Sequence, residues 1–236
     1  GQVMLALGGL FLLNLLLRVS YIRYDFVNGD EGVRALSAVQ MLDGARLYVD
    51  VVTDKPPGAS LFYAAVFAMF GRSMKAVHLA ATVWNFGTSL IVFLTASMFY
   101  TKRVGLCAAL LFVYFSTNYF TQDMMAANTE LLMVLPYTAS IYLFMVASEM
   151  NRGRAGVSSA LLLAAAGMLT GVAFLFKQIG VLNLLFFASY EVLIVWKMRR
   201  DQIDVGAAWV MGSFRRVVGH LALLGSGFAL VLAIFA

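Results

Sequence analysis

Cysteine and histidine are almost absent from this chain. It has a single cysteine, Cys107, inside an apolar run, and two histidines, His78 and His220, that lie far apart in the sequence. One cysteine gives no framework of disulfides, and this spacing matches no cysteine–histidine metal motif. The sequence therefore excludes a disulfide-stabilised fold and a zinc-type cluster.

Charged residues are scarce as well. They make up 12% of the 236 residues, whereas 62% are hydrophobic, and the mean hydropathy is +0.86. A soluble globular domain has about 25% charged and about 45–50% apolar residues, so the composition excludes that class. The net charge is +5, but most lysines and arginines lie in short connections between apolar runs, which argues against a nucleic-acid partner.

Long apolar runs are what the chain has instead. A helix needs about 20 apolar residues to cross the hydrocarbon core of a bilayer, and the runs predict an all-α, polytopic transmembrane helical bundle. We expect about seven spans, close to residues 3–17, 77–100, 104–120, 131–150, 157–176, 180–196 and 217–236. Because the chain begins and ends within apolar runs, we expect residues 1–236 to form a single transmembrane domain, the N-terminal part of a longer protein.

A long polar segment, residues 18–57, follows the first span. Within it, residues 30–42 predict an amphipathic helix of a length and charge that suit the membrane surface rather than a crossing. Its apolar side consists of Val33, Leu36, Val39 and Leu42. The next apolar stretch, residues 59–70, is too short to span comfortably and predicts an interfacial or re-entrant helix.

The lysines and arginines predict the orientation. If residues 59–70 do not cross, three basic connections share one side and are cytoplasmic by the positive-inside rule. These connections are residues 101–103, 151–154 and 197–216. Residues 18–57 then form the first outer-face loop. Whether or not residues 59–70 cross the membrane, residues 121–130 lie opposite the basic connections.

The pair Asp30-Glu31 opens the predicted surface helix. A carboxylate held there, close to the membrane, could act as a general base. The structural interpretation is that Asp30 caps the helix and that Glu31 favours the positive end of its dipole. Both interpretations are open at this point.

The segment Asp54-Lys55-Pro56-Pro57 precedes the short apolar helix. Because proline rigidifies the backbone, this segment would present Asp54 and Lys55 at fixed positions just above the membrane. A carboxylate can hold a hard divalent cation, and an ammonium can hold a phosphate. The alternative is a proline turn with an incidental ion pair.

Two further charges lie at the ends of apolar runs. Glu130 follows Asn128-Thr129, where asparagine caps helices and an acid in the first turn is favourable; functionally, it adds an acid on the same face as Asp30. Lys177 would cost about 2.5–3.5 kcal/mol at the centre of a span, but much less near a helix end. It is therefore either an interface anchor or an anion contact.

Taken in order, these features resemble the GT-C integral-membrane glycosyltransferases, in particular the protein O-mannosyltransferase and lipid A aminoarabinose transferase type. The matching segments are Asp30-Glu31, Asp54-Lys55-Pro56-Pro57, Thr129-Glu130 and Gly171 to Lys177. They cover most of the chain from Asp30 to Gly180. Each motif is short, but their order and spacing together are fairly specific.

The resemblance implies an inverting transfer of a sugar from a polyprenyl phosphate to a lipid, glycan or protein acceptor. The reaction would take place outside the cytoplasm. The compact loops and the lack of obvious eukaryotic targeting signals suit the plasma membrane of a bacterium. Asp30 would be the base, with Glu31 beside it, and Glu130 would assist at the acceptor. The donor phosphate would be bound by Lys55, Arg34 and Lys177, and Asp54 would help bind a divalent metal cation of unspecified identity.

Two departures from the family pattern leave an alternative open. Relatives often carry an arginine three residues after the first aspartate, whereas this chain has Val33 there and Arg34 next. Relatives are also longer, with a later metal ligand or a soluble C-terminal domain. The alternative is a non-catalytic GT-C-like subunit that serves as a helical partner in a larger membrane complex. A transporter fits less well, because transporters usually place essential charges near the membrane midplane.

Overall fold

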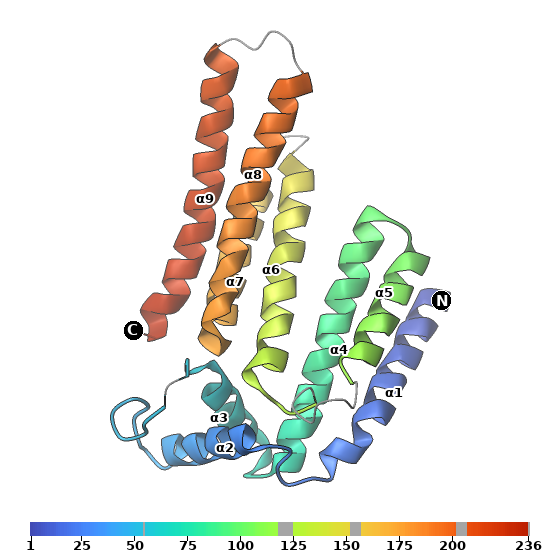
Figure 1. Ribbon diagram of the computed structural model, residues 1–236, viewed down its shortest axis with the longest axis vertical. Coiled ribbons are helices and arrows are strands. Elements are labelled where there is room, and N and C mark those ends of the chain that lie inside the picture. The colour runs from blue at the N-terminus through green and yellow to red at the C-terminus, as the bar shows by residue number, and fades with distance from the viewer. Residues whose placement is uncertain (54, 118–124, 152–156, 202–206, 236) are drawn as a thin grey trace. The chain divides into compact units, whose positions relative to one another are not determined.

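The computed structural model describes residues 1–53, 55–117, 125–151, 157–201 and 207–235 (Figure 1). These residues form α-helices joined by short connections and one short 3₁₀-helix, which confirms the all-α prediction. The helices are α1 (Gln2–Ile22), α2 (Gly29–Leu42), α3 (Gly58–Phe70), α4 (Met74–Phe99), α5 (Lys102–Phe115), α6 (Thr129–Asn151), α7 (Val157–Phe176), η2 (Gln178–Val181), α8 (Leu182–Asp201) and α9 (Ala207–Phe235).

Six helical segments in the described residues are long and apolar enough to cross a membrane, close to the seven spans expected. The expected span at residues 104–120 accounts for the difference. The helix α5 has 14 residues, about 21 Å at 1.5 Å per residue, against about 30 Å of hydrocarbon. The short apolar helix expected at residues 59–70 is α3.

The contacts divide the chain into two compact units. The first consists of Gly1–Thr138 and Leu175–Gln178. Within it, α1, α4 and α5 pack around a core of Leu10, Phe93, Ala109 and Val113. The helices α2 and α3 pack on each other and on the first half of α4, around a second core centred on Tyr63, Phe67 and Val77. Figure 1 shows α2 running across the direction of α4 rather than along it.

The helix α2 leaves most of its large apolar residues exposed, although Val39 packs against the core. Val33, Leu36 and Leu42 are exposed, whereas the buried positions include Glu31, Arg34 and small residues such as Ala38. Small side chains allow α2 to approach α3 and α4 closely, and the larger apolar ones remain free to enter a membrane interface. The position of α2 on the membrane surface stays a prediction.

The second unit consists of Ala139–Phe174 and Ile179–Ala236. Its helices approach each other closely at glycine residues, which have no side chain to keep them apart. A Cβ atom on Gly167 would lie 2.0 Å from the carbonyl oxygen of Leu224, and one on Gly227 would lie 2.1 Å from that of Ala164. Such contacts between small residues are typical of helix packing in membranes, where burial of apolar surface provides little driving force.

Two hydrogen bonds between buried side chains also join helices of the second unit. The Asn183 amide donates to the Ser140 hydroxyl at 2.6 Å, and His220 Nδ1 meets Glu191 Oε1 at 2.8 Å. Because these groups lie in apolar segments, pairing them avoids the cost of an unsatisfied polar group. We assign them a packing role.

Candidate functional site

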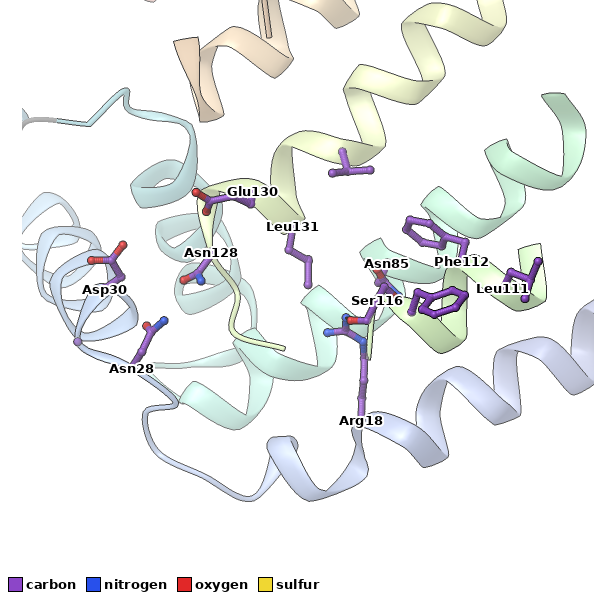
Figure 2. A pocket seen from close by; sticks show the side chains of 13 residues that line it. Arg18, Asn28, Asp30, Asn85, Leu111, Phe112, Ser116, Asn128, Glu130 and Leu131 are labelled. Carbon is purple, nitrogen blue, oxygen red and sulfur yellow. The ribbon is translucent and has the colours of Figure 1, made fainter. Parts of the chain in front are cut away.

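The first unit contains a cavity of about 1150 Å³, shown in Figure 2. Its walls come from α1, α2, α4, α5 and the start of α6. One part of the wall is polar and acidic, with Asn28, Asp30, Asn128 and Glu130. Another is apolar, with Leu111, Phe112, Phe115, Leu131 and Val134. A cavity with both kinds of wall suits an amphiphilic ligand with a polar head and an apolar chain.

Asp30 lies at the acidic part of the cavity, in the first turn of α2. Its side chain is 64% exposed and lies 3.7 Å from the guanidinium of Arg34, one helical turn away. The structural interpretation of the sequence, in which Asp30 caps the helix, is wrong. The cap is Asn28, whose side-chain oxygen accepts a hydrogen bond from the backbone N–H of Glu31 at 3.1 Å. The Asp30 carboxylate therefore remains available to the cavity.

Glu31, the next residue, is buried and holds three segments together. Its two carboxylate oxygens accept hydrogen bonds from the backbone N–H groups of Val27 and Ala127, each at 2.7 Å. They also lie 3.1 and 3.2 Å from His78 Nε2 on α4. Burial by itself raises the pKa of Glu31, but the hydrogen bonds with His78, Val27 and Ala127 outweigh it and lower the pKa below its ordinary value. Glu31 thus fixes the start of α2 against α4 and the segment before α6.

Glu130 and Lys177 form an ion pair although they are 47 residues apart. Lys177 Nζ lies 2.5 Å from Glu130 Oε1, and the Thr129 hydroxyl donates to the other Glu130 oxygen at 2.9 Å. Lys177 follows directly after the last residue of α7, which agrees with the expectation of a lysine near a helix end. The pair is partly exposed, at 41% for Lys177 and 58% for Glu130, and Glu130 lines the cavity.

The proline segment lies against the same end of α7. A Cβ atom on Gly58 would lie 2.6 Å from the carbonyl oxygen of Leu175, so only glycine permits this approach. Lys55 is exposed, and its backbone carbonyl accepts a hydrogen bond from the Tyr48 hydroxyl at 2.8 Å. The contact between Gly58 and the Leu175 backbone thus holds two of the predicted segments next to each other, the one with Lys55 and the one with Lys177.

Of the expected site residues, Asp30 and Glu130 line the cavity, whereas Glu31 and Lys177 do not. Lys55 is not part of the wall, and Arg34 is buried behind Asp30 rather than facing the cavity. Asp54, the expected metal ligand, lies outside the described residues. No group of three or more histidine, cysteine, aspartate or glutamate side chains that could hold a metal ion occurs in the described part of the chain. These residues alone do not fit a metal site.

Arg18 is the charged residue of the cavity wall that was not expected from the sequence. The first span was expected to end at residue 17, but the helix α1 continues to Ile22 and buries the Arg18 side chain to 2% exposure. Arg18 lines the cavity beside Asn85 and Ser116 (Figure 2). A single arginine that continues an apolar helical run is a signal that could have identified it, because charges inside such runs commonly mark functional sites.

Comparison with known proteins gives one family. The model of the dolichyl-phosphate-mannose-protein mannosyltransferase family matches residues 54–232, which is most of the chain. Glu130 and Lys177 lie within the match, whereas Asp30 and Arg18 precede it. No curated protein and no solved structure matches the chain.

Proposed function

The chain belongs to the dolichyl-phosphate-mannose-protein mannosyltransferase family of multi-pass membrane glycosyltransferases, and we propose that it transfers a sugar from a polyprenyl-phosphate donor to an acceptor, with Asp30 as the base. The acceptor is a lipid, a glycan or a protein. The reaction proceeds at the extracytoplasmic face of a bacterial plasma membrane. The observation that carries the proposal is the cavity with carboxylates on one wall and apolar side chains on another.

The cavity matches the chemistry of such a donor. The polar sugar would lie near Asp30 and Glu130, with the phosphate next to it, while the first isoprene units would lie along Leu111, Phe112 and Phe115. At about 1150 Å³, the cavity slightly exceeds the common range of small-molecule sites, about 300–1,000 Å³. There is therefore room for both a head group and part of a chain.

The reaction proposed for this site is a single displacement. The acceptor oxygen attacks the anomeric carbon, the bond from that carbon to the phosphate oxygen breaks, and polyprenyl phosphate leaves. Asp30 takes the proton from the acceptor, and Arg34, one turn along α2, orients its carboxylate at 3.7 Å. Attack on the face opposite the departing phosphate inverts the configuration of the anomeric carbon.

The leaving phosphate gains one negative charge during this step. Cations held near the leaving oxygen stabilise this developing charge. We assign part of this role to Lys177 and Lys55, whose segments meet where Gly58 packs on Leu175. Glu130 holds Lys177 in place at 2.5 Å and contacts the acceptor from the cavity wall. A divalent metal remains part of the proposal only through Asp54, and no step above depends on it.

The orientation of the site is supported by the basic turn Lys102–Arg103. The helix α4 carries His78 near one end, and the turn that follows its other end leads to Lys102 and Arg103. Its 26 residues correspond to about 39 Å, so the acidic site and this turn lie at opposite ends of a full span. With the basic turn in the cytoplasm, the site lies outside.

The test compares two aspartates that each pair with a nearby arginine. Membranes that contain the full-length protein, the Asp30→Asn variant or the Asp50→Asn variant are supplied with radiolabelled polyprenyl-phosphate sugars and endogenous acceptors. Asp50 is the control, because it is exposed and pairs with Arg46 at 3.3 Å, but does not line the cavity. We expect a loss of about 100-fold or more for Asp30→Asn, as for removal of a general base, and little change for Asp50→Asn.

Unchanged transfer in Asp30→Asn would remove the base from the proposal. The absence of transfer in all three preparations, with the protein stably inserted and a broad donor panel, would favour the non-catalytic membrane subunit instead.

A further inference from the structure

Arg18 carries a buried positive charge at the cavity wall. Its guanidinium donates to two backbone carbonyls, that of Ser116 at 2.9 Å and that of Met125 at 3.4 Å. Its Nε is buried without a hydrogen-bond partner among the described residues. Both carbonyl contacts are neutral, so neither balances the charge.

The carboxylates of the cavity are already paired with other cations. Asp30 lies beside Arg34, and Glu130 is paired with Lys177. In the part of the chain that the structure describes, no carboxylate lies within ion-pair distance of Arg18. The C-terminal end of α5, which Arg18 reaches through Ser116, supplies roughly half a negative charge from the helix dipole. Among the described residues, a positive charge therefore remains at the cavity wall.

A buried charge is costly unless an opposite charge or several hydrogen bonds compensate it. Arginine also binds phosphate well, because its planar fork can donate two parallel hydrogen bonds. The neighbouring polar groups, Asn85 and Ser116, keep this part of the wall hydrophilic; the Asn85 amide donates to the Ser116 hydroxyl at 3.0 Å. On α5, the residues just before Ser116 supply the apolar wall at Leu111, Phe112 and Phe115.

We propose that Arg18 binds the phosphate of a lipid whose chain lies along this face of α5. This inference rests on the proposed function and adds a phosphate-binding residue to it. It places the phosphate near Ser116, with the sugar toward Asp30 and the isoprenoid toward Leu111 and Phe112. Figure 2 shows Arg18 and Ser116 between Asp30 and Phe112. A free phosphate anion shares the head-group chemistry but would not use the apolar wall.

The test measures binding rather than transfer, so that it does not depend on the acceptor. The full-length protein in detergent is titrated with polyprenyl phosphate, with the uncharged polyprenol of the same length, and with inorganic phosphate. The variants are Arg18→Gln, which removes the charge, and Arg18→Lys, which keeps it but loses the planar fork.

The matched control is Asn14→Ala. Asn14 is also a buried polar residue of α1, one turn before Arg18, and it joins α1 to α4 through Thr82 and Asn85, but it does not line the cavity. Loss of binding caused only by a weakened α1 packing would therefore appear in Asn14→Ala as well.

For polyprenyl phosphate, we expect Arg18→Gln to bind about tenfold or more weakly, Arg18→Lys to be intermediate, and Asn14→Ala to resemble the wild type. Polyprenol should bind all four proteins similarly, and inorganic phosphate should bind far more weakly than the lipid.

Equal losses for polyprenyl phosphate and polyprenol, or a loss in Asn14→Ala equal to that in Arg18→Gln, would show that Arg18 only supports the fold. Equal binding of polyprenyl phosphate by the wild type and Arg18→Gln would overturn the inference while leaving the proposed function intact. If the wild type bound no polyprenyl phosphate, the proposed function itself would fail. Binding of inorganic phosphate as tight as that of the lipid would overturn the lipid as occupant.

Discussion

The Glu31 carboxylate lies 3.1 Å from the imidazole of His78, inside the first unit and away from the cavity wall. Its neighbour Asp30 faces the cavity, because consecutive residues on an α-helix point about 100° apart. The two adjacent acids therefore have different surroundings: Glu31 is fully hydrogen-bonded within the fold, while Asp30 is exposed with one distant cation partner. This contrast supports Asp30 as the chemically active member of the pair.

Replacement of Glu31 by glutamine should destabilise the protein. Glutamine retains one acceptor oxygen, so its amide would face one of the backbone N–H groups of Val27 and Ala127. An unsatisfied buried group costs about 1–3 kcal/mol, and thermal unfolding in detergent should show a loss of this size for Glu31→Gln. Asp50→Asn, at an exposed carboxylate, should leave the unfolding temperature nearly unchanged.

The same residue predicts an acid-sensitive stability. The folded state lowers the pKa of Glu31 below its ordinary value of 4.5, so its contribution is complete above about pH 4.5 and is lost as the pH falls through the lowered pKa. The wild type should therefore lose more stability than Glu31→Gln when unfolding is measured at decreasing pH below this value. Parallel curves for the two proteins would contradict the role of the ionised carboxylate.

The pair Glu130–Lys177 should matter more for activity than for stability. Both side chains are partly exposed, and such ion pairs contribute about 0–1 kcal/mol. We expect Glu130→Gln and Lys177→Gln to change the unfolding free energy by less than about 1 kcal/mol, but each to lower transfer about 10- to 100-fold. The double variant should be little worse than the poorer single variant, because residues in one network act together. Strictly multiplicative losses would show that the two residues act separately.

A large side chain in the apolar wall should weaken use of the lipid donor. Leu111 lines the cavity, whereas Leu110, its neighbour on α5, does not. Leu111→Trp should raise the KM for the donor about tenfold, a loss of about 1.4 kcal/mol of binding, while Leu110→Trp serves as the control for an added tryptophan on the same helix. Similar kinetics for both variants would place the isoprenoid elsewhere.

The close contact between Gly58 and Leu175 predicts a position that tolerates no side chain. The added methyl group of Gly58→Ala would lie 2.6 Å from a backbone oxygen, and overpacking of this kind costs about 1–3 kcal/mol. The shift should also lower transfer, because Lys177 follows two residues after Leu175. Gly9→Ala, a helical position with open space around it, should be neutral or slightly stabilising in the same unfolding measurement.

Much of this architecture follows from the sequence, because a bilayer imposes a strong and local rule. Each run of about 20 apolar residues must satisfy its backbone groups internally and forms a helix, so the spans α4, α6, α7 and α8 were predicted within a few residues. The helices α2 and α3 were also predicted, α2 from its amphipathic pattern and α3 from a short apolar stretch. The first span was cut too short at residue 17, because the charge of Arg18 reads as the start of a loop when its partners across the bundle are unknown.

What the sequence by itself determined is the class of protein, the helices and the residues with reactive side chains. Only the tertiary structure decided the surroundings of each of these residues. The difference between the surroundings of Asp30 and Glu31 depends on Ala127 and His78, which are 96 and 47 residues from Glu31 in the chain. The pairing of Glu130 with Lys177 and the burial of Arg18 against Ser116 likewise depend on distant segments. Hydrogen bonding and desolvation are set by whatever packs nearby in space, and no pattern local to these residues encodes that neighbourhood.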